Sequence, residues 1–269
     1  MDLSLKGKAA LVTGSSAGIG LAIARRLALE GASVAICGRR VEQLQEVAAR
    51  LRTETGARIE AVNADVMAPA DVERLVARTQ QAFGRIDILV NNVGTGTYKP
   101  FLEVTEADLQ NAMQMNFFSM FRVTQKVVPL MVQQGGGSIV NVSGTSGSFV
   151  PDPPFFSTCS GPAKAAENRF TKALAMELGP SNIRVNCVAP GRVFAPERFE
   201  RWIRDIASRT GRETDIATLQ AEWGSRIPLP GHRWADVEEI ANLVVFAASP
   251  ACGFVNGALL IADGGEARD

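Results

Sequence analysis

The chain has one histidine, one tyrosine and four cysteines among its 269 residues, and this scarcity excludes several kinds of site. The cysteines, Cys37, Cys159, Cys187 and Cys252, are scattered and form no C-x-x-C pair. Neither a zinc cluster nor a disulfide scaffold is therefore expected. Isolated cysteines are typical of small buried side chains in a reducing compartment, so we expect a cytoplasmic protein without a metal.

An excess of charge and long apolar runs are also missing. The 28 basic and 28 acidic side chains balance, so nothing favours nucleic acid or an anionic membrane surface as a partner. No apolar run reaches the roughly 18 residues that a membrane span needs, and residues 1–6 do not resemble a signal peptide. What is present is a hydrophobic fraction of 46%, enough for a large core. We expect one domain over residues 1–269, because no repeat or linker divides the chain.

Apolar strand patterns alternate with helical patterns along almost the whole chain. Strands are predicted at 9–12, 33–37, 58–62, 86–90, 138–142, 183–188 and 258–261, and helical spacing fills the segments between them. Two of the predicted helices are adjacent, at 106–113 and 115–133. This rhythm predicts an α/β fold, a Rossmann-type doubly wound parallel sheet of seven strands flanked by helices. The charged segment 194–226 interrupts it, which alone indicates a surface insertion.

A glycine-rich turn follows the first strand and opens the first helix. Gly14 permits a tight turn, while Gly18 and Gly20 allow backbone to approach a ligand and the neighbouring helix. Amides at a helix start favour an anion, so the stretch predicts a phosphate site, although a turn with nothing bound has the same glycines. The predicted contacts are Gly14, Ser15, Ser16, Gly18, Ile19 and Gly20.

The end of the second strand indicates which dinucleotide is used. An acidic residue at this point selects NAD by accepting the ribose 2′-hydroxyl. Here the position is Gly38, followed directly by Arg39 and Arg40. A guanidinium matches the geometry of a 2′-phosphate, so we predict NADP(H) rather than NAD(H). The alternative is that both arginines are solvated charges at the start of a helix.

The spacing Thr13-Gly14-x-x-x-Gly18-Ile19-Gly20 resembles the cofactor loop of the short-chain dehydrogenase/reductase family. The resemblance extends over almost the whole chain and implies the fold predicted above. It also implies an adenine contact at Asp65 and Val66 and a nicotinamide contact at the loop after the sixth strand. The residues of that loop are Pro190, Gly191 and Val193. Between the two contacts, Asn92 is implied to brace the sheet beside the cofactor, and Gly94 to let the cofactor pass.

The family's chemistry uses a Tyr that exchanges the proton, a Lys four positions later, a Ser after the fifth strand and an Asn in a preceding helix. Asn116 and Lys164 match two of these, and Lys164 is implied to hold the cofactor ribose as well. The Tyr position holds Ser160, and the Ser position holds Gly144 or, with the register shifted by one, Ser143 or Thr145. A serine hydroxyl is a far weaker acid than a phenol, whose pKa is about 10.

These matches predict an NADP(H)-dependent oxidoreductase that acts on a small-molecule carbonyl or alcohol with an atypical active site. Two alternatives stay open: an impaired homologue that binds dinucleotide as a regulatory or partner protein, and non-redox chemistry in the same pocket. Tyr98 is a candidate proton donor from a neighbouring loop. The resemblance also implies that 194–226 is a lid over the substrate, with Phe199, Trp202 and Trp223 as candidate contacts.

The wide apolar arc of the predicted helix 115–133 exceeds what one face of a sheet can cover. We therefore expect a homo-oligomer, a tetramer of the family type, although a deeply buried helix in a monomer has the same pattern.

Overall fold

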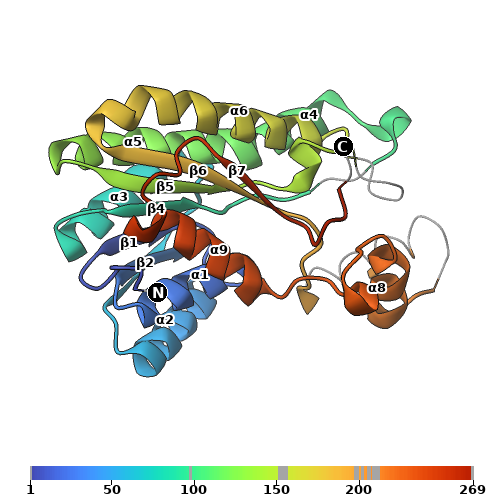
Figure 1. Cartoon of the computed structure of the whole chain (residues 1–269), viewed down its shortest axis with the longest axis horizontal. Coiled ribbons are helices and arrows are strands. Elements are labelled where there is room, and N and C mark those ends of the chain that lie inside the picture. Colours follow the sequence, from blue (N-terminus) through green and yellow to red (C-terminus); the bar gives the residue numbers. More distant parts are fainter. Residues whose placement is uncertain are drawn as a thin grey trace.

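A parallel sheet buried on both faces forms the centre of the molecule (Figure 1). The structure is a computed structural model that describes residues 2–96, 99–150, 157–196, 200, 203–204, 207 and 213–267. Within these residues seven parallel strands follow the order β3-β2-β1-β4-β5-β6-β7, which confirms the predicted doubly wound sheet. The strands are β1 Ala9–Val12, β2 Ser33–Gly38, β3 Ile59–Asn63, β4 Ile88–Asn91, β5 Gly137–Val142, β6 Ile183–Pro190 and β7 Leu259–Ala262.

The strands read as apolar runs because both faces of the sheet are covered. Successive side chains of a strand point to opposite faces. In β1, Ala10 and Val12 join the core on one face, and Leu11 joins the core on the other. In β5, Val140 and Ile139 divide in the same way. A strand that is buried on both faces does not alternate between polar and apolar residues. Such a strand is therefore predicted from a continuous apolar run.

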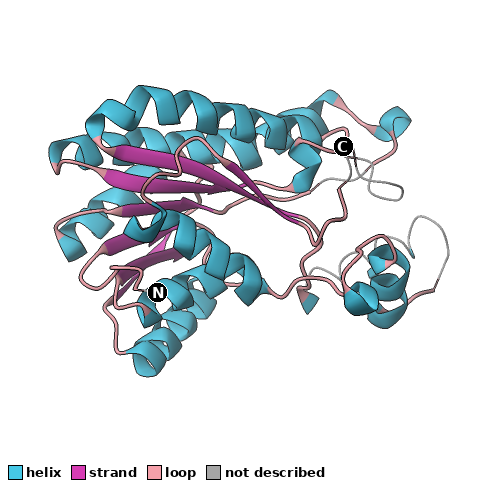
Figure 2. Ribbon diagram, viewed as in Figure 1, coloured by secondary structure: helices cyan, strands magenta, loops and turns pink. Residues whose placement is uncertain are grey.

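Two layers of helices enclose the sheet (Figure 2). The helices are α1 Gly18–Leu29, α2 Val41–Thr55, α3 Pro69–Phe83, α4 Glu106–Met113, α5 Ser119–Gln133, α6 Ser160–Leu178, α8 Ile216–Gly224 and α9 Val237–Ala248. Helices α1, α2 and α9 supply the apolar core on one face, and α3, α5 and α6 supply the core on the other. All strands run in the same direction, but the order in which the chain adds them to the sheet reverses between β1 and β4. Ligands of such sheets bind at the strand ends beside this reversal of strand order.

A buried chain of polar side chains joins two strands to the helices α5 and α6. Asn91, the last residue of β4, donates its amide to Thr124 of α5 at 3.0 Å and to Asn141 of β5 at 2.9 Å. Asn141 in turn donates to Thr171 of α6 at 2.9 Å. These side chains are nearly excluded from solvent, so each bond replaces one that water would otherwise make. The chain fixes both helices relative to the strand ends.

We expect Asn91→Ala to lower the free energy of unfolding by about 2–4 kcal/mol. The change leaves two buried acceptors without their donor, and each unsatisfied group costs about 1–3 kcal/mol. Urea unfolding followed by circular dichroism measures the loss. The matched control is Asn111→Ala on the exposed surface of α4, which we expect to be nearly neutral. An equal, small effect for both variants would contradict the structural role of the chain.

Candidate active site

A cleft runs along the carboxyl ends of the strands, beside the reversal between β1 and β4. Its volume of about 2010 Å³ exceeds the roughly 300–1,000 Å³ of a typical small-molecule pocket, so it has room for a dinucleotide and a substrate together. Most of the predicted cofactor contacts line it: Gly14, Ser16, Gly18, Ile19, Gly20, Arg39, Arg40, Asp65, Val66, Asn92, Gly94, Lys164, Pro190, Gly191 and Val193. Ser143 and Ser160 line it as well.

The glycine turn forms a cradle that only glycine permits. Gly14 has a φ of 61°, in the left-handed region. A Cβ on Gly20 would lie 2.4 Å from the carbonyl oxygen of Gly14 and 2.5 Å from Nδ2 of Asn92. The N-cap of α1 is Ala17, which makes no side-chain cap. The first amides of α1 therefore remain available to an anion in the cleft, and the cradle fits the phosphates of a dinucleotide.

Ser15 is the predicted cofactor contact that the structure does not place in the cleft. Its side chain is fully buried, and its hydroxyl donates to the carbonyl oxygen of Val12 at 2.7 Å and accepts from the amide of Cys37 at 3.0 Å. Its own amide donates to the carbonyl oxygen of Cys37 at 3.0 Å. Ser15 therefore fastens β1 to β2 beneath the glycine turn.

The end of β2 carries a cationic side chain and little space at Gly38 for a larger one. A Cβ on Gly38 would lie 3.0 Å from Oγ of Ser16, which is too close for a larger side chain without movement. The Arg39 side chain is 71% exposed, and its guanidinium lies 3.9 Å from the Asp65 carboxylate. Such an exposed, long contact contributes little, so Arg39 is free to turn toward a phosphate. Arg40 is the N-cap of α2.

Asn116 lies in a π-helical turn, Gln114–Phe118, where the sequence predicted a break between two helices. The side chain is fully buried, donates to the carbonyl oxygen of Ala112 at 2.8 Å and accepts from the amide of Thr95 at 3.1 Å. A Cβ on Gly94 would lie 2.7 Å from Oδ1 of Asn116 and 2.8 Å from Nζ of Lys164. The turn therefore brings the amide and the ammonium to the same glycine. π-Helical turns are frequent at functional sites.

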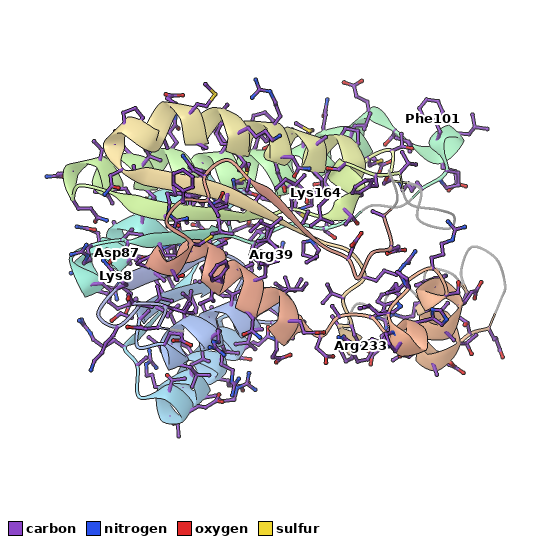
Figure 3. The ribbon with its side chains drawn as sticks, viewed as in Figure 1. Lys8, Arg39, Asp87, Phe101, Lys164 and Arg233 are labelled. Carbon is purple, nitrogen blue, oxygen red and sulfur yellow. The ribbon has the colours of Figure 1, made fainter. Side chains whose placement is uncertain are left out.

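Lys164 has a buried carboxylate beside it. Its Nζ lies 3.2 Å from Oε1 and 3.3 Å from Oε2 of Glu167, one turn later on α6. Glu167 is only 2% exposed. Burial raises the pKa of Glu167, because the loss of water outweighs the opposing effects of the Lys164 ammonium and the Ser143 hydroxyl. Lys164, labelled in Figure 3, lies on α6, and α2, the helix that follows Arg39, covers the opposite face of the sheet.

The sequence prediction missed Glu167, although a signal for it exists. Ser160, Ala163, Lys164, Glu167 and Thr171 recur at helical spacing and form one buried stripe of α6. A carboxylate on such a stripe is almost never buried unless it is paired. The cation three positions earlier is a suitable partner, because residues three apart are neighbours on a helix.

Positions 160 and 144, where the sequence departs from the family's pattern, differ in what surrounds them. Ser160 is 1% exposed, and its hydroxyl has no hydrogen-bond partner among the described residues. A Cβ on Gly144 would approach no atom closer than 3.9 Å, so this position opens to free space. The Ser143 hydroxyl instead donates to the carbonyl oxygen of Lys164 at 3.3 Å. Gly144 thus offers room for the family's serine, while Ser143 faces α6.

Several predicted contacts fall on residues that the structure does not describe: Tyr98, Phe199 and Trp202. Trp223 is described and is 7% exposed. Its ring stacks on Trp234 with centroids 6.2 Å apart, within a small apolar cluster that includes Leu219 and Ile227. Trp223 therefore packs inside the segment around α8, whereas Trp234 and Phe194 line the cleft.

Metal ligands and membrane spans are not found in the part of the chain that the structure describes. No cluster of three or more His, Cys, Asp or Glu side chains among these residues is arranged to hold a metal ion. None of the helices in the same residues has the length and hydropathy that crossing a membrane requires. All four cysteines are buried and free.

Comparison with known proteins agrees with this architecture. Residues 8–202 match the family model described as short chain dehydrogenase. Oxidoreductase UcpA of Salmonella typhimurium is 36% identical over 262 residues, which cover 97% of this chain and 95% of UcpA.

Two solved structures are also similar over nearly the full length. L-sorbose reductase from Gluconobacter frateurii, in complex with NADPH and L-sorbose, is 33% identical with a TM-score of 0.91, covering 100% of both chains. An NADPH-bound short-chain oxidoreductase from Pseudomonas aeruginosa, with an atypical catalytic center, is 28% identical with a TM-score of 0.87, covering 97% of both chains. The sequence, the doubly wound sheet and these relatives together show that the chain belongs to the short-chain dehydrogenase family and is an oxidoreductase.

Proposed function

We propose that this oxidoreductase uses NADP(H) to interconvert a carbonyl and an alcohol. One observation carries the proposal: a single cleft joins the glycine cradle and Arg39 to Lys164. The cofactor, when bound, supplies or accepts the hydride. The chain's own residues bind it, orient the substrate and move the proton. Both solved relatives described above contain NADPH, which supports this choice of cofactor.

At the cofactor end, backbone amides of the glycine cradle are positioned for the diphosphate, and Arg39 for the ribose 2′-phosphate. Asp65 and Val66 line the adenosine side of the cleft, and Pro190, Gly191 and Val193 line the side beyond β6. Gly38 contributes by lacking a carboxylate, which would repel a phosphate and accept a free 2′-hydroxyl instead. The preference for NADP(H) thus depends on one arginine and one missing side chain.

We expect Arg39→Ala to remove most of the preference for NADPH over NADH. A charge-assisted hydrogen bond contributes roughly 1.5–3 kcal/mol, which corresponds to about 10- to 150-fold in affinity. Fluorescence titration with each dinucleotide measures the two affinities. The matched control is Arg78→Ala, which removes an exposed arginine of α3 that is paired with Glu60. Equal affinity of the wild type for both dinucleotides would contradict the assignment of Arg39.

At the catalytic end, Lys164 and Asn116 flank Gly94, and Ser160 lies one helical turn before Lys164. We assign Lys164 to the ribose and to the proton path, and Asn116 to holding the polar groups beside Lys164. Ser160 and Ser143 are the hydroxyls available to a substrate oxygen or to a water beside it. General acid catalysis contributes about 10²–10⁴-fold. Because position 160 holds a serine where the family has the phenol of a tyrosine, we expect a low turnover of ordinary carbonyls.

We expect the wild type to bind NADPH but to reduce small aldehydes and ketones slowly. Ser160→Tyr places a phenol one helical turn from Lys164 on the same face, and Gly144→Ser adds a hydroxyl where space is open. Both act on the same substrate oxygen, so the double variant should exceed the sum of the single variants in log rate. NADPH oxidation against a carbonyl panel measures all four proteins.

This comparison also separates the proposed enzyme from a regulatory dinucleotide-binding protein. Slow wild-type turnover that Ser160→Tyr increases supports the enzyme. NADPH binding without turnover in any of the four proteins would favour the regulatory protein. Fast wild-type turnover that Ser160→Tyr slows would mean that Ser160 belongs to a working alternative mechanism. The atypical catalytic center of the Pseudomonas relative supports the enzyme.

We also propose that 194–226 forms a lid and that the protein is cytoplasmic. Phe194, Ala195 and Arg226 of that segment line the cleft, which supports a role over the substrate. The four buried free cysteines suit a reducing compartment.

We propose in addition a homotetramer, because apolar side chains remain exposed around α4 and α5. Leu109 and Phe118 are each 37% exposed, and Phe101 and Leu102, which precede α4 in the chain, are 72% and 96% exposed. Exposed apolar side chains that gather into a patch are typical of subunit contacts. Sedimentation velocity at micromolar concentration should give a tetramer, and Phe118→Asp should shift it toward smaller species. A monomeric wild type would contradict the proposal.

A further inference from the structure

The buried carboxylate beside Lys164 has no role in the function proposed so far. Glu167 lies behind the cleft, between α6 and the ends of β5 and β6. The ionisable groups that face it among the described residues are Lys164, on its own helix, and Cys187 of β6. The Ser143 hydroxyl, just beyond β5, is its other polar neighbour. A glutamate placed here serves no solvent contact, because only 2% of it is exposed.

The geometry of the pair differs from that of a tight ion pair. The two nitrogen–oxygen distances are 3.2 and 3.3 Å, longer than the roughly 2.7–2.9 Å of a charge-assisted hydrogen bond between fully charged partners. Burial also raises the pKa of Glu167, which favours the neutral carboxylic acid. Contact with Nζ and a raised pKa together describe a carboxyl group that is suited to hold a proton next to the ammonium.

The other side of Lys164 faces the cleft, and none of the described residues that line the cleft carries a phenol. Position 160 holds a serine where the family has a tyrosine. The buried hydroxyl of Ser160 has no hydrogen-bond partner among the described residues. An unpartnered buried hydroxyl in the lining of a cleft is positioned to bind a substrate oxygen or a water. Lys164 therefore lies between a hydroxyl that needs a partner and a carboxyl that is suited to hold a proton.

We propose that Glu167 stores the proton for carbonyl reduction and delivers it through Lys164, in place of the missing phenol. Glu167 acts through Lys164 and is thus a positioning and proton-storing residue, while Lys164 faces the reacting atoms. The proposal rests on the proposed carbonyl–alcohol chemistry.

The proton balance of the reduction is complete with these groups. The carbonyl carbon gains a hydride from the cofactor, and the electron pair of the C=O π bond takes a proton from Nζ of Lys164, directly or through one water at Ser160. Nζ regains a proton from the Glu167 carboxyl group. Lys164 thus ends as the ammonium it was, and Glu167 ends as a carboxylate. Solvent entering the cleft after product release returns the proton, and alcohol oxidation runs the same steps in reverse.

The first test combines Glu167→Gln with Ser160→Tyr. Glutamine keeps the shape of the side chain but holds no transferable proton. We expect Glu167→Gln to lower kcat for carbonyl reduction by about 10²-fold or more, in line with the loss of a general acid, and to leave the affinity for NADPH little changed. In the Ser160→Tyr background the same change should cost much less, because the phenol donates the proton. Glu177→Gln, at an exposed position of α6, is the matched control.

The pH profile adds a readout that a purely structural role does not move. Reduction by the wild type requires the protonated form of Glu167, so its rate should fall as the pH rises through the raised pKa of that group. Glu167→Asp should keep this limb, with its midpoint moved, and Glu167→Gln should lose it. Equal losses from Glu167→Gln with and without Tyr at position 160, or an unchanged pH profile, would overturn the proposal.

The second test needs neither substrate nor cofactor. Because burial raises the pKa of Glu167 from its ordinary value of 4.5, the folded protein binds more protons than the unfolded chain above that pH. Stability must then fall as the pH rises from about 4.5 through the folded-state pKa. The melting temperature of the wild type should fall relative to that of Glu167→Gln over this range. A constant difference, or a rise, would mean that Glu167 is ionised throughout and would overturn the proposal.

These tests separate the relay from the function on which it rests. A wild type and a Ser160→Tyr variant that both bind NADPH and reduce no carbonyl would contradict the proposed function and, with it, the relay. The relay alone would be contradicted if the proteins are active but their rate does not fall as the pH rises through the pKa of Glu167. It would also be contradicted if Glu167→Gln has the same effect with and without Ser160→Tyr.

Discussion

Hydrogen bonds between Asn92 and the glycine turn hold together the two strand ends on which the whole cleft depends. The side-chain nitrogen Nδ2 of Asn92 donates to the carbonyl oxygens of Thr13 and Gly14 at 3.1 and 3.2 Å. The backbone N–H of Asn92 donates to the hydroxyl of Thr13 at 2.9 Å. These bonds join the ends of β1 and β4, where the strand order reverses. Because Gly20 packs against the same atoms, the start of α1 is fixed there too.

The two ends of the cleft are built by different means. The cofactor end uses mainly backbone: a glycine turn, the first amides of α1 and the gap at Gly38. Such a site tolerates changes in side chains elsewhere, because its groups come from the main chain. The catalytic end depends on single functional groups. In the function proposed above, a serine in place of a phenol at position 160 changes the proton chemistry, and a second acid such as Glu167 acquires importance.

Much of the fold could be predicted from the sequence, because its strands are buried on both faces and its helices have an apolar stripe. The predicted strand 9–12 and helix 106–113 match β1 and α4 to the residue. Other ends agree or moved by up to four residues, and helix caps such as Arg40 and Ala17 make no side-chain bond that a sequence motif would reveal. The break predicted near residue 114 is a π-helical turn, because wider backbone bonding there continues α4 into α5.

The sequence by itself determined the family, the doubly wound sheet and most of the predicted residues that line the cleft, because glycine spacing and apolar runs act through local backbone geometry. Only the tertiary structure decided which way each polar side chain turns. It directs Ser15 beneath the glycine turn, Ser143 toward α6 and Gly144 toward open space. It also buries Glu167 beside Lys164, a pairing whose chemistry depends on how completely α6, β5 and β6 exclude water. Desolvation is a property of the packed molecule, and no local pattern specifies it.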